Sequence, residues 1–235
     1  MPNSWFQFKR FIIHHDRCGQ KVGTDGVLLG VWANHPNPKR ILDIGTGTGL
    51  ISLMLAQRFE NARIIGIEIE RECAHQATEN VHISPFADRV TILHSSLQEF
   101  KEKENFDLIV SNPPFFERSL RSGNPVRDLA RHADFLPPKE LFCLSADVSH
   151  SESRLNLIIP HDKAEDWISL GKDNGWFAIL RTNVRGLPHR PPKRVLLSFA
   201  RQPKTLKISD LTIENSRHQY SDEFWALVKD FYLEK

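Results

Sequence analysis

The stretch DIGTGTG, Asp43 to Gly49, follows the β-branched run RIL and leads into the apolar run LISLMLA. A turn between strand and helix is where an α/β sheet presents backbone N–H groups and a helix N-terminus to a ligand. Glycines at 45, 47 and 49 permit a tight turn and a close approach. A dinucleotide fingerprint needs its third glycine at position 50, which is a leucine here. The stretch predicts a ligand-binding turn that disfavours a pyrophosphate; a simple tight turn is the alternative.

Apolar runs alternate with helical patterns on both sides of this turn. Strands are predicted at RILDIG, ARIIGIEI, RVTILHSS, FDLIVSN and RLNLIIP, and helices at LISLMLAQRF, 70–83 and 138–149. A parallel crossover needs a connection the length of a helix. The order therefore predicts an α/β fold with a mostly parallel, doubly wound sheet covered on both faces.

The pattern changes after Pro160. A helix is predicted at AEDWISLGKDNG, strands at WFAILRTNVRG, RVLLSFARQ and LTIEN, and a last helix over 221–232. GLPHRPPK is too rich in proline for a central strand and predicts a hairpin loop. A hairpin adds an antiparallel strand near the C-terminal end of the sheet.

Composition bounds the class of protein. The chain has 235 residues, 40% of them hydrophobic, which suffices for one main domain. Its three cysteines, Cys18, Cys73 and Cys143, are widely spaced and form no CxxC pair, so we expect neither a disulfide framework nor a zinc site. No HxxxH or HExxH spacing is present, so no metal site is expected. With no signal peptide and no run of roughly 18 apolar residues, the sequence predicts a soluble, cytoplasmic protein.

Charge is nearly balanced overall, at +2, but not along the chain. Residues 181–207 contain eight Lys or Arg and no Asp or Glu. Either a solvated basic face or a phosphate-contacting surface would account for this stretch.

Glu68 ends the second predicted strand, 23 residues after Gly45. A carboxylate at that point can accept hydrogen bonds from two ribose hydroxyls, although a solvated glutamate beside Glu70 is the alternative. DIGTGTG, GIEIE and SNPPF, in this order, resemble class I S-adenosylmethionine-dependent methyltransferases, which have a Rossmann-like fold.

That resemblance implies a set of cofactor contacts. Asp43, Gly45 and Gly47 would border the methionine end of S-adenosylmethionine, and Glu68 would hold its ribose. Many members place an Asp after the third strand against the adenine amino group, and Ser96 stands there in HSSLQEF. The remaining residues predicted to bind the cofactor are Lys21, Thr24, Thr46, Gly49 and Asn112.

The stretch SNPPFF, Ser111 to Phe116, offers two fixed acceptors, the side-chain carbonyl of Asn112 and the backbone carbonyl of Pro113. Proline fixes φ and restricts the residue before it, so these acceptors are pre-positioned. If these two carbonyls accept hydrogen bonds from both hydrogens of an amino group conjugated to an aromatic ring, the nitrogen lone pair is aimed at a sulfonium methyl. Catalysis would then rest on positioning and electrostatics. With Pro114, and with Phe115 stacking on the substrate, they form the predicted catalytic set. The motif is compatible with adenine, guanine or protein glutamine.

The N-terminal order F-K-x-F, H-x-D-R-C and K-V-G-T-D-G-V-L-L-G closely resembles bacterial tRNA adenine-N6 methyltransferases that modify the adenosine next to the anticodon of a valine tRNA. RHADFLPPKELFCLSADV, LNLIIP and YSDEFWALVKDFY extend the resemblance over nearly the whole chain. It implies that Lys21, Thr24 and Asp25 lie against the cofactor or the catalytic pocket. Residues 1–39 would then pack over the cofactor and substrate side of a methyltransferase domain spanning 40–235.

A tRNA loop would lie over the strand tips with its adenine flipped toward Asn112. Its phosphates would meet the predicted substrate-binding arginines Arg10, Arg17, Arg118, Arg121, Arg127 and Arg131. Ribosomal RNA, DNA or a protein glutamine are alternative substrates, and a non-catalytic binding module is the alternative of another class. We expect a monomer that uses neither a metal nor a membrane.

Overall fold

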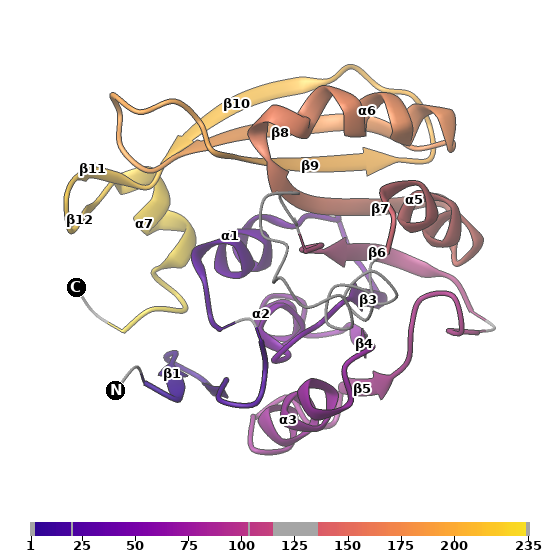
Figure 1. Cartoon of the computed structure of the whole chain (residues 1–235), viewed down its shortest axis with the longest axis vertical. Helices are drawn as coiled ribbons and strands as arrows, with labels where there is room; N and C mark the ends of the chain where they lie inside the picture. Colours follow the sequence, from indigo (N-terminus) through magenta and orange to yellow (C-terminus); the bar gives the residue numbers. More distant parts are fainter. Residues whose placement is uncertain (1–2, 20, 103, 115–135, 234–235) are drawn as a thin grey trace, which may run out of the picture.

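An eight-stranded sheet forms the centre of the molecule (Figure 1). The computed structural model describes residues 3–19, 21–102, 104–114 and 136–233. The strand order is β10-β8-β9-β7-β6-β3-β4-β5. In chain order these strands are β3 (Arg40–Ile44), β4 (Arg63–Glu68), β5 (Val90–His94), β6 (Phe106–Ser111), β7 (Ser149–Pro160), β8 (Phe177–Arg185), β9 (Arg194–Ala200) and β10 (Lys207–Thr212).

The sheet is parallel from β5 through β7 and mixed beyond it. β9 runs antiparallel to both β7 and β8, and β10 returns parallel to β8. The predicted mostly parallel sheet with an antiparallel strand near its C-terminal end is thus confirmed. The strand predicted at LTIEN is displaced: β10 begins at Lys207 and ends at Thr212, and Glu214–Ser216 (β11) pairs with Gln219–Tyr220 (β12) in a separate hairpin. The side chains of 207–210 are exposed at the sheet edge, so no apolar alternation marks this strand.

Helices cover both faces because successive residues of the central strands are mostly apolar and point to opposite faces of the sheet. Ile41 and Leu42 of β3, for example, belong to cores on opposite faces. One face carries α1 (Thr24–Trp32), α2 (Leu50–Arg58) and α7 (Asp222–Val228), and the other carries α5 (Pro138–Asp147) and α6 (Ala164–Asp173), which follows the short turn η1 (His161–Lys163). α3 (Arg71–His82) flanks β4 and β5. Helices α2, α3, α5, α6 and α7 lie where the sequence predicted helices, whereas α1 was not predicted.

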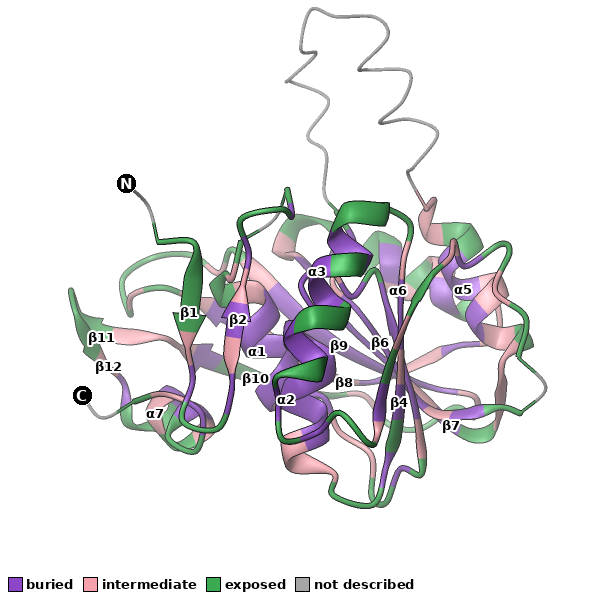
Figure 2. Cartoon of the chain, turned by 90° about the horizontal axis from the view of Figure 1, so that it is seen from below, coloured by how far each residue is buried: buried purple, intermediate pink, exposed green. Residues whose placement is uncertain are grey.

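Helix α2 packs against α1 and against β4 and β5 of the sheet and is almost wholly buried, whereas α3 exposes one side (Figure 2). Gly30 of α1 allows this close approach, since a Cβ there would stand 2.6 Å from the sulfur of Met54. The helix that follows the glycine-rich turn is therefore fixed from both sides.

The N-terminal segment shares the core of the main sheet. β1 (Trp5–Gln7) and β2 (Ile12–His14) form a hairpin, and Phe8, Phe11 and Ile13 are buried in the same core cluster as α2. The backbone N–H of Lys9 donates to the carbonyl of Phe231, which places the hairpin beside the C-terminal end (Figure 1). The division at residue 39 stays a prediction, and the two parts share one hydrophobic core.

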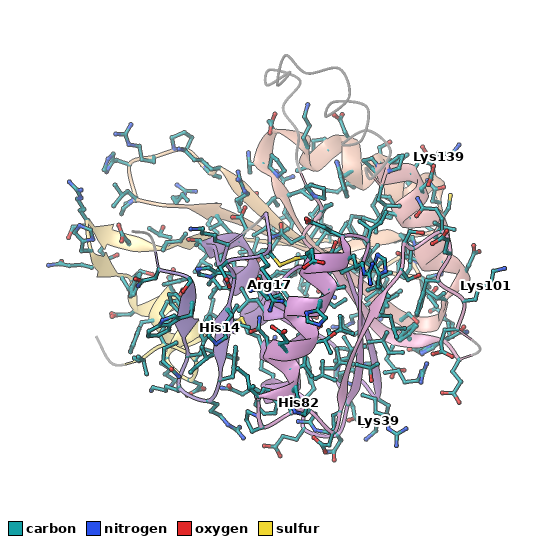
Figure 3. All side chains as sticks on the ribbon, turned by 60° about the horizontal axis from the view of Figure 1, so that its bottom comes forward. His14, Arg17, Lys39, His82, Lys101 and Lys139 are labelled. Atoms are coloured by element: carbon teal, nitrogen blue, oxygen red, sulfur yellow. A yellow bond between two sulfur atoms is a disulfide. The ribbon has the colours of Figure 1, made fainter. Side chains whose placement is uncertain are left out.

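The expectation drawn from the cysteines was wrong for one pair. Cys18 and Cys73 form a disulfide, with their Cα atoms 4.8 Å apart, while Cys143 is a free thiol (Figure 3). The two are 55 residues apart in sequence, and they meet because the N-terminal segment packs on the first turn of α3. The side-chain amide of Gln76 holds that contact, because its Nε2 donates to the Asp16 carboxylate and its Oε1 accepts from the N–H of Arg17. In the described part of the chain, no helix has the length and apolar character needed to cross a membrane.

Replacing Phe8 by alanine tests whether the N-terminal segment belongs to the cooperative core. Phe8 is fully buried, so Phe8→Ala should lower the free energy of unfolding by about 3–5 kcal/mol through lost transfer energy and a cavity. Trp5→Ala is the control, because Trp5 is 47% exposed, and it should change stability by less than about 1 kcal/mol. Urea unfolding measures both, and equal small effects would mean that the segment unfolds separately from the sheet.

Candidate active site

The glycine-rich turn joins β3 to α2 at the carboxyl edge of the sheet. Gly45, Gly47 and Gly49 have φ of 68°, 57° and 82°, in the left-handed region that favours glycine. The N–H groups of Gly45 and Thr46 both donate to the carbonyl of Ile67, at 3.0 Å, which ties the turn to β4. A Cβ at position 45 or 47 would meet nothing within 4 Å. The backbone there is both fixed and open to a ligand.

Asp43 lies beneath this turn and is fully buried. Its Oδ2 accepts hydrogen bonds from the hydroxyls of Thr46, at 2.7 Å, and Ser52, at 2.8 Å. Its Oδ1 has no partner among the described residues. Burial raises the pKa of the Asp43 carboxyl to about 6, although the two hydroxyl donors oppose the shift. Asp43 lines neither of the cavities described next, so any role toward a ligand passes through the turn that it holds.

Two cavities adjoin at the turn. The first, of about 480 Å³, is lined by the ends of β3, β4 and β6 and by the residues after β5, and the second, of about 280 Å³, by the turn and the start of α1. Gly45, Gly47 and Asn112 line both. Three residues predicted to bind the cofactor, Lys21, Thr24 and Thr46, line the second cavity, and Glu68 and Ser96 line the first. The structure thus gathers most of the predicted cofactor site, whereas Gly49 lines neither cavity and is the N-cap of α2.

Glu68 joins the turn to the wall of the first cavity. Its Oε2 accepts from the N–H of Gly47 at 2.9 Å, and its Oε1 accepts from the N–H of Glu70 at 3.0 Å. Each carboxylate oxygen has a second lone-pair site, so both can accept a further hydrogen bond from a ligand. The carboxylate is therefore held in one orientation at the cavity.

The residues after β5 form the far wall of the first cavity. The N–H of Ser95 donates to the carbonyl of Glu68 at 2.9 Å, and the Ser96 hydroxyl accepts from the N–H of Glu99 at 3.2 Å. Leu97 and Ile69, which is 41% exposed, add apolar surface to this cavity. A flat apolar ring with polar edges would suit such a wall.

Asn112 follows β6 where the two cavities meet. The neighbouring Ser111 is buried, and its hydroxyl donates to the carbonyl of Ile44 at 2.9 Å, which locks the end of β6 to β3. Asn112 is half-buried, Pro113 is buried and Pro114 is exposed, and both prolines line the first cavity. Phe115 lies outside the described residues. An amide oxygen and a proline carbonyl are thus presented from a rigid strand end.

The start of α1 lines the second cavity and carries one member of a charged pair. Asp25 lines this cavity, and its Oδ2 accepts from Nε of Arg194 at 2.7 Å. The resemblance indicated Asp25, but neither Arg194 nor Ser52 was predicted as a site residue. Nothing in the sequence marks them, because each acts only through a partner that folding brings close.

The predicted substrate arginines are only partly visible. Arg10 is exposed and lies over the ring of Phe86, 5.2 Å from its centroid. Arg17 pairs with Glu79 and His75 on α3 (Figure 3). Neither lines a cavity. The other four, Arg118, Arg121, Arg127 and Arg131, lie outside the described residues. Among all the residues that the structure describes, no group of three or more His, Cys, Asp or Glu side chains could hold a metal ion.

Comparison with known proteins identifies the family. A family model described as methyltransferase small domain matches residues 22–138. A protein of Phocaeicola vulgatus described as tRNA1(Val) (adenine(37)-N6)-methyltransferase is 47% identical, with 99% of each chain covered. The chain belongs to the tRNA1(Val) (adenine(37)-N6)-methyltransferase family. A relative with the same description in Photorhabdus laumondii is 40% identical over 97% of this chain and 95% of its own. Membership confirms the resemblance read from the sequence motifs.

Solved structures agree on the fold. A predicted O-methyltransferase of Agrobacterium tumefaciens has a TM-score of 0.69 at 19% identity and covers 88% of this chain and 96% of its own. TYW2 of P. horikoshii, solved in complex with MeSAdo, has a TM-score of 0.58 at 14% identity, and the match covers 84% of this chain and 71% of the TYW2 chain. At these identities the likeness shows the methyltransferase fold alone.

The raised pKa of Asp43 predicts a pH dependence. A carboxyl that binds its proton more tightly when folded loses its stabilising contribution as pH rises from its unfolded pKa of 3.8 to about 6. The free energy of unfolding of the wild type, minus that of Asp43→Asn, should therefore fall by about 2.4 kcal/mol between pH 4 and pH 7, since each pKa unit is about 1.4 kcal/mol and part of the change has already occurred at pH 4. Denaturant titrations at each pH measure it, and parallel profiles would refute the shift.

Proposed function

We propose that this protein transfers the methyl group of S-adenosylmethionine to the N6 amino group of an adenosine in tRNA, the adenosine next to the anticodon of a valine tRNA. The observation that carries the proposal is the position of Asn112 where the two cavities meet, with Pro113 beside it in the first cavity, in a chain of this family. Relatives at 40–47% identity are named for this activity. The finer assignments below rest on the fit of the residues to that chemistry.

The cavities fit the two ends of S-adenosylmethionine. The first offers the Glu68 carboxylate for ribose hydroxyls and an apolar wall with Ser96 at its edge for adenine. The second offers open glycine backbone with Lys21, Thr24 and Asp25, a mixed set of charges that suits an amino-acid group carrying both an ammonium and a carboxylate. The bound cofactor supplies an electrophilic methyl group on a sulfonium. Asp43, buried under the turn, would serve this site by holding Thr46 and α2 in place.

The residues at the strand end would act on the amino group of the substrate. The lone pair of an aromatic amino group is delocalised into the ring, which makes it a poor nucleophile. Acceptance of its two hydrogens by the Asn112 side-chain carbonyl and the Pro113 carbonyl favours the pyramidal form and aims the lone pair at the methyl. This is catalysis by positioning and electrostatics, and it needs no strong general base. Stacking by Phe115 on the adenine stays a prediction.

The remaining proposals concern the setting of the enzyme. Two of the arginines predicted to bind substrate are described. Arg10 has no ion pair among the described residues, whereas Arg17 pairs with Glu79, so a phosphate bound by Arg17 would compete with that carboxylate. We propose a cytoplasmic monomer that meets tRNA there. In a reducing cytoplasm, Cys18 and Cys73 would be held as neighbouring thiols rather than as a bond.

Substitution of Asn112 tests the reaction. Asn112→Ala should lower the rate of methyl transfer by roughly two to three orders of magnitude, because a fixed hydrogen-bonding group at the reacting centre is lost. Affinity for S-adenosylmethionine should change only a few-fold. Asn61→Ala is the control, since Asn61 is exposed in the turn before β4, at the opposite edge of the sheet.

The assay uses radiolabelled S-adenosylmethionine with total tRNA, ribosomal RNA, DNA and cell protein, each from cells lacking the gene. Label in tRNA, recovered as N6-methyladenosine after digestion, supports the proposal. Label in another pool would replace the substrate, and label in none would favour a binding module. Equal rates for wild type and Asn112→Ala would remove Asn112 from the reaction.

Substitution of Glu68 tests the cofactor assignment. Glu68→Ala should weaken S-adenosylmethionine binding by roughly 10- to 100-fold, because hydrogen bonds to a charged acceptor contribute about 1.5–3 kcal/mol. Glu72→Ala is the matched control, since Glu72 is exposed on the first turn of α3 and lines neither cavity. Calorimetry measures both, and an unchanged affinity for Glu68→Ala would refute the ribose contact.

A further inference from the structure

The basic stretch 181–207 divides into two kinds of side chain. Four of its eight cations are engaged within the protein. Arg181 pairs with Glu165, Arg185 with Asp210 and Arg194 with Asp25, and Arg201 lies over the ring of Trp176. The other four are Arg190, Lys193, Lys204 and Lys207, which are exposed and have no ion pair among the described residues. Only these four offer free positive charge to a partner.

The sheet topology sends these four cations to opposite edges. β9 begins at Arg194, which pairs with Pro160 at the end of β7, so the connection 186–193 lies at the carboxyl edge of the parallel strands. This is the edge that holds Asn112 and the glycine-rich turn. Lys204 and Lys207 stand after the end of β9 and at the start of β10, at the amino edge. Arg190 and Lys193 are therefore on the side of the active site.

The connection 186–193 is also firmly held. It contains three prolines, which restrict its backbone. The N–H of Lys193 donates to the carbonyl of Val184 at 2.9 Å, its carbonyl accepts from His161 at 3.1 Å, and the N–H of Arg190 donates to Leu187 at 3.0 Å. The next residue, Arg194, is tied to Asp25 in the wall of the second cavity. The two free cations thus stand on a rigid loop one residue from a direct link to the catalytic cavity.

We propose that residues 186–193 form an RNA-contacting loop in which Arg190 and Lys193 bind backbone phosphates of the tRNA whose adenosine reaches Asn112. This inference rests on the proposed function and adds a contact surface to it. Because the loop is already ordered, its exposed cations would lose little conformational entropy on binding. They suit a polyanion such as RNA, whose backbone must be held in one position over the site. Phosphate contacts of this kind position the RNA without reading its sequence.

The test compares two double variants of the full-length protein. Arg190→Gln with Lys193→Gln removes two charges at the active-site edge, and Lys204→Gln with Lys207→Gln removes two charges of the same stretch at the other edge. The hydrogen bonds that hold the loop are made by backbone groups and survive both changes. Binding of total tRNA is measured from low to moderate salt, with methyl transfer and S-adenosylmethionine affinity alongside.

The loop variant should bind tRNA roughly tenfold more weakly at low salt, and its salt slope should be shallower by about 2, one for each lost phosphate contact. Its cofactor affinity and its rate at saturating tRNA should match those of the wild type. The variant with Lys204→Gln and Lys207→Gln should match the wild type in tRNA binding, salt slope, rate and cofactor affinity. Unchanged binding by the loop variant, equal losses in both variants, or a lost cofactor affinity would overturn the inference. A wild type that methylates no tRNA would instead overturn the proposed function.

Discussion

The buried carboxylate of Asp43 supports the turn on which the whole site depends. It binds one hydroxyl from the turn, that of Thr46, and one from α2, that of Ser52, so strand, turn and helix are fixed at one atom. The turn is then tied to β4 through the carbonyl of Ile67 and the carboxylate of Glu68. Backbone held in the left-handed region at two glycines leaves an open surface shared by both cavities. The geometry of the ligand site follows from this one anchored turn.

This anchor has an energetic cost. Burial disfavours the charged carboxylate, and two neutral donors offset only part of that penalty. The remaining oxygen is buried without a partner among the described residues. Stability is given up directly under the candidate site, which is where proteins commonly retain unfavourable local interactions in exchange for a fixed geometry. The rest of the sheet, with apolar cores on both faces, compensates for it.

The sequence predicts what local pattern controls. Strands such as FDLIV are apolar on both faces, and the turn DIGTGTG and the prolines after Asn112 restrict the backbone by themselves, so the sheet and the centre of the site could be placed. β10 was misplaced because its exposed edge residues carry no apolar period. The Cys18–Cys73 bond and the Arg194–Asp25 pair were missed because each joins distant segments through tertiary packing. Charge counting alone also treated the stretch 181–207 as one surface, although four of its cations are occupied and the strand order splits the rest.

Asp25 and Arg194 pair although 169 positions separate them in the chain. The side-chain ammonium of Lys9 donates to the backbone carbonyl of Lys229, which lies 220 positions later. Domains fold during synthesis from the N-terminus onward. A nascent chain can therefore form β3, the turn and β4 early, yet Asp25 in the wall of the second cavity has no Arg194 to pair with until β9 has been made. The N-terminal hairpin likewise lacks its C-terminal neighbour until the last residues emerge. The ion pair beside the second cavity is thereby coupled to a late stage of synthesis, so a chain cut short before β9 would carry the ligand turn with the Asp25 carboxylate unpaired.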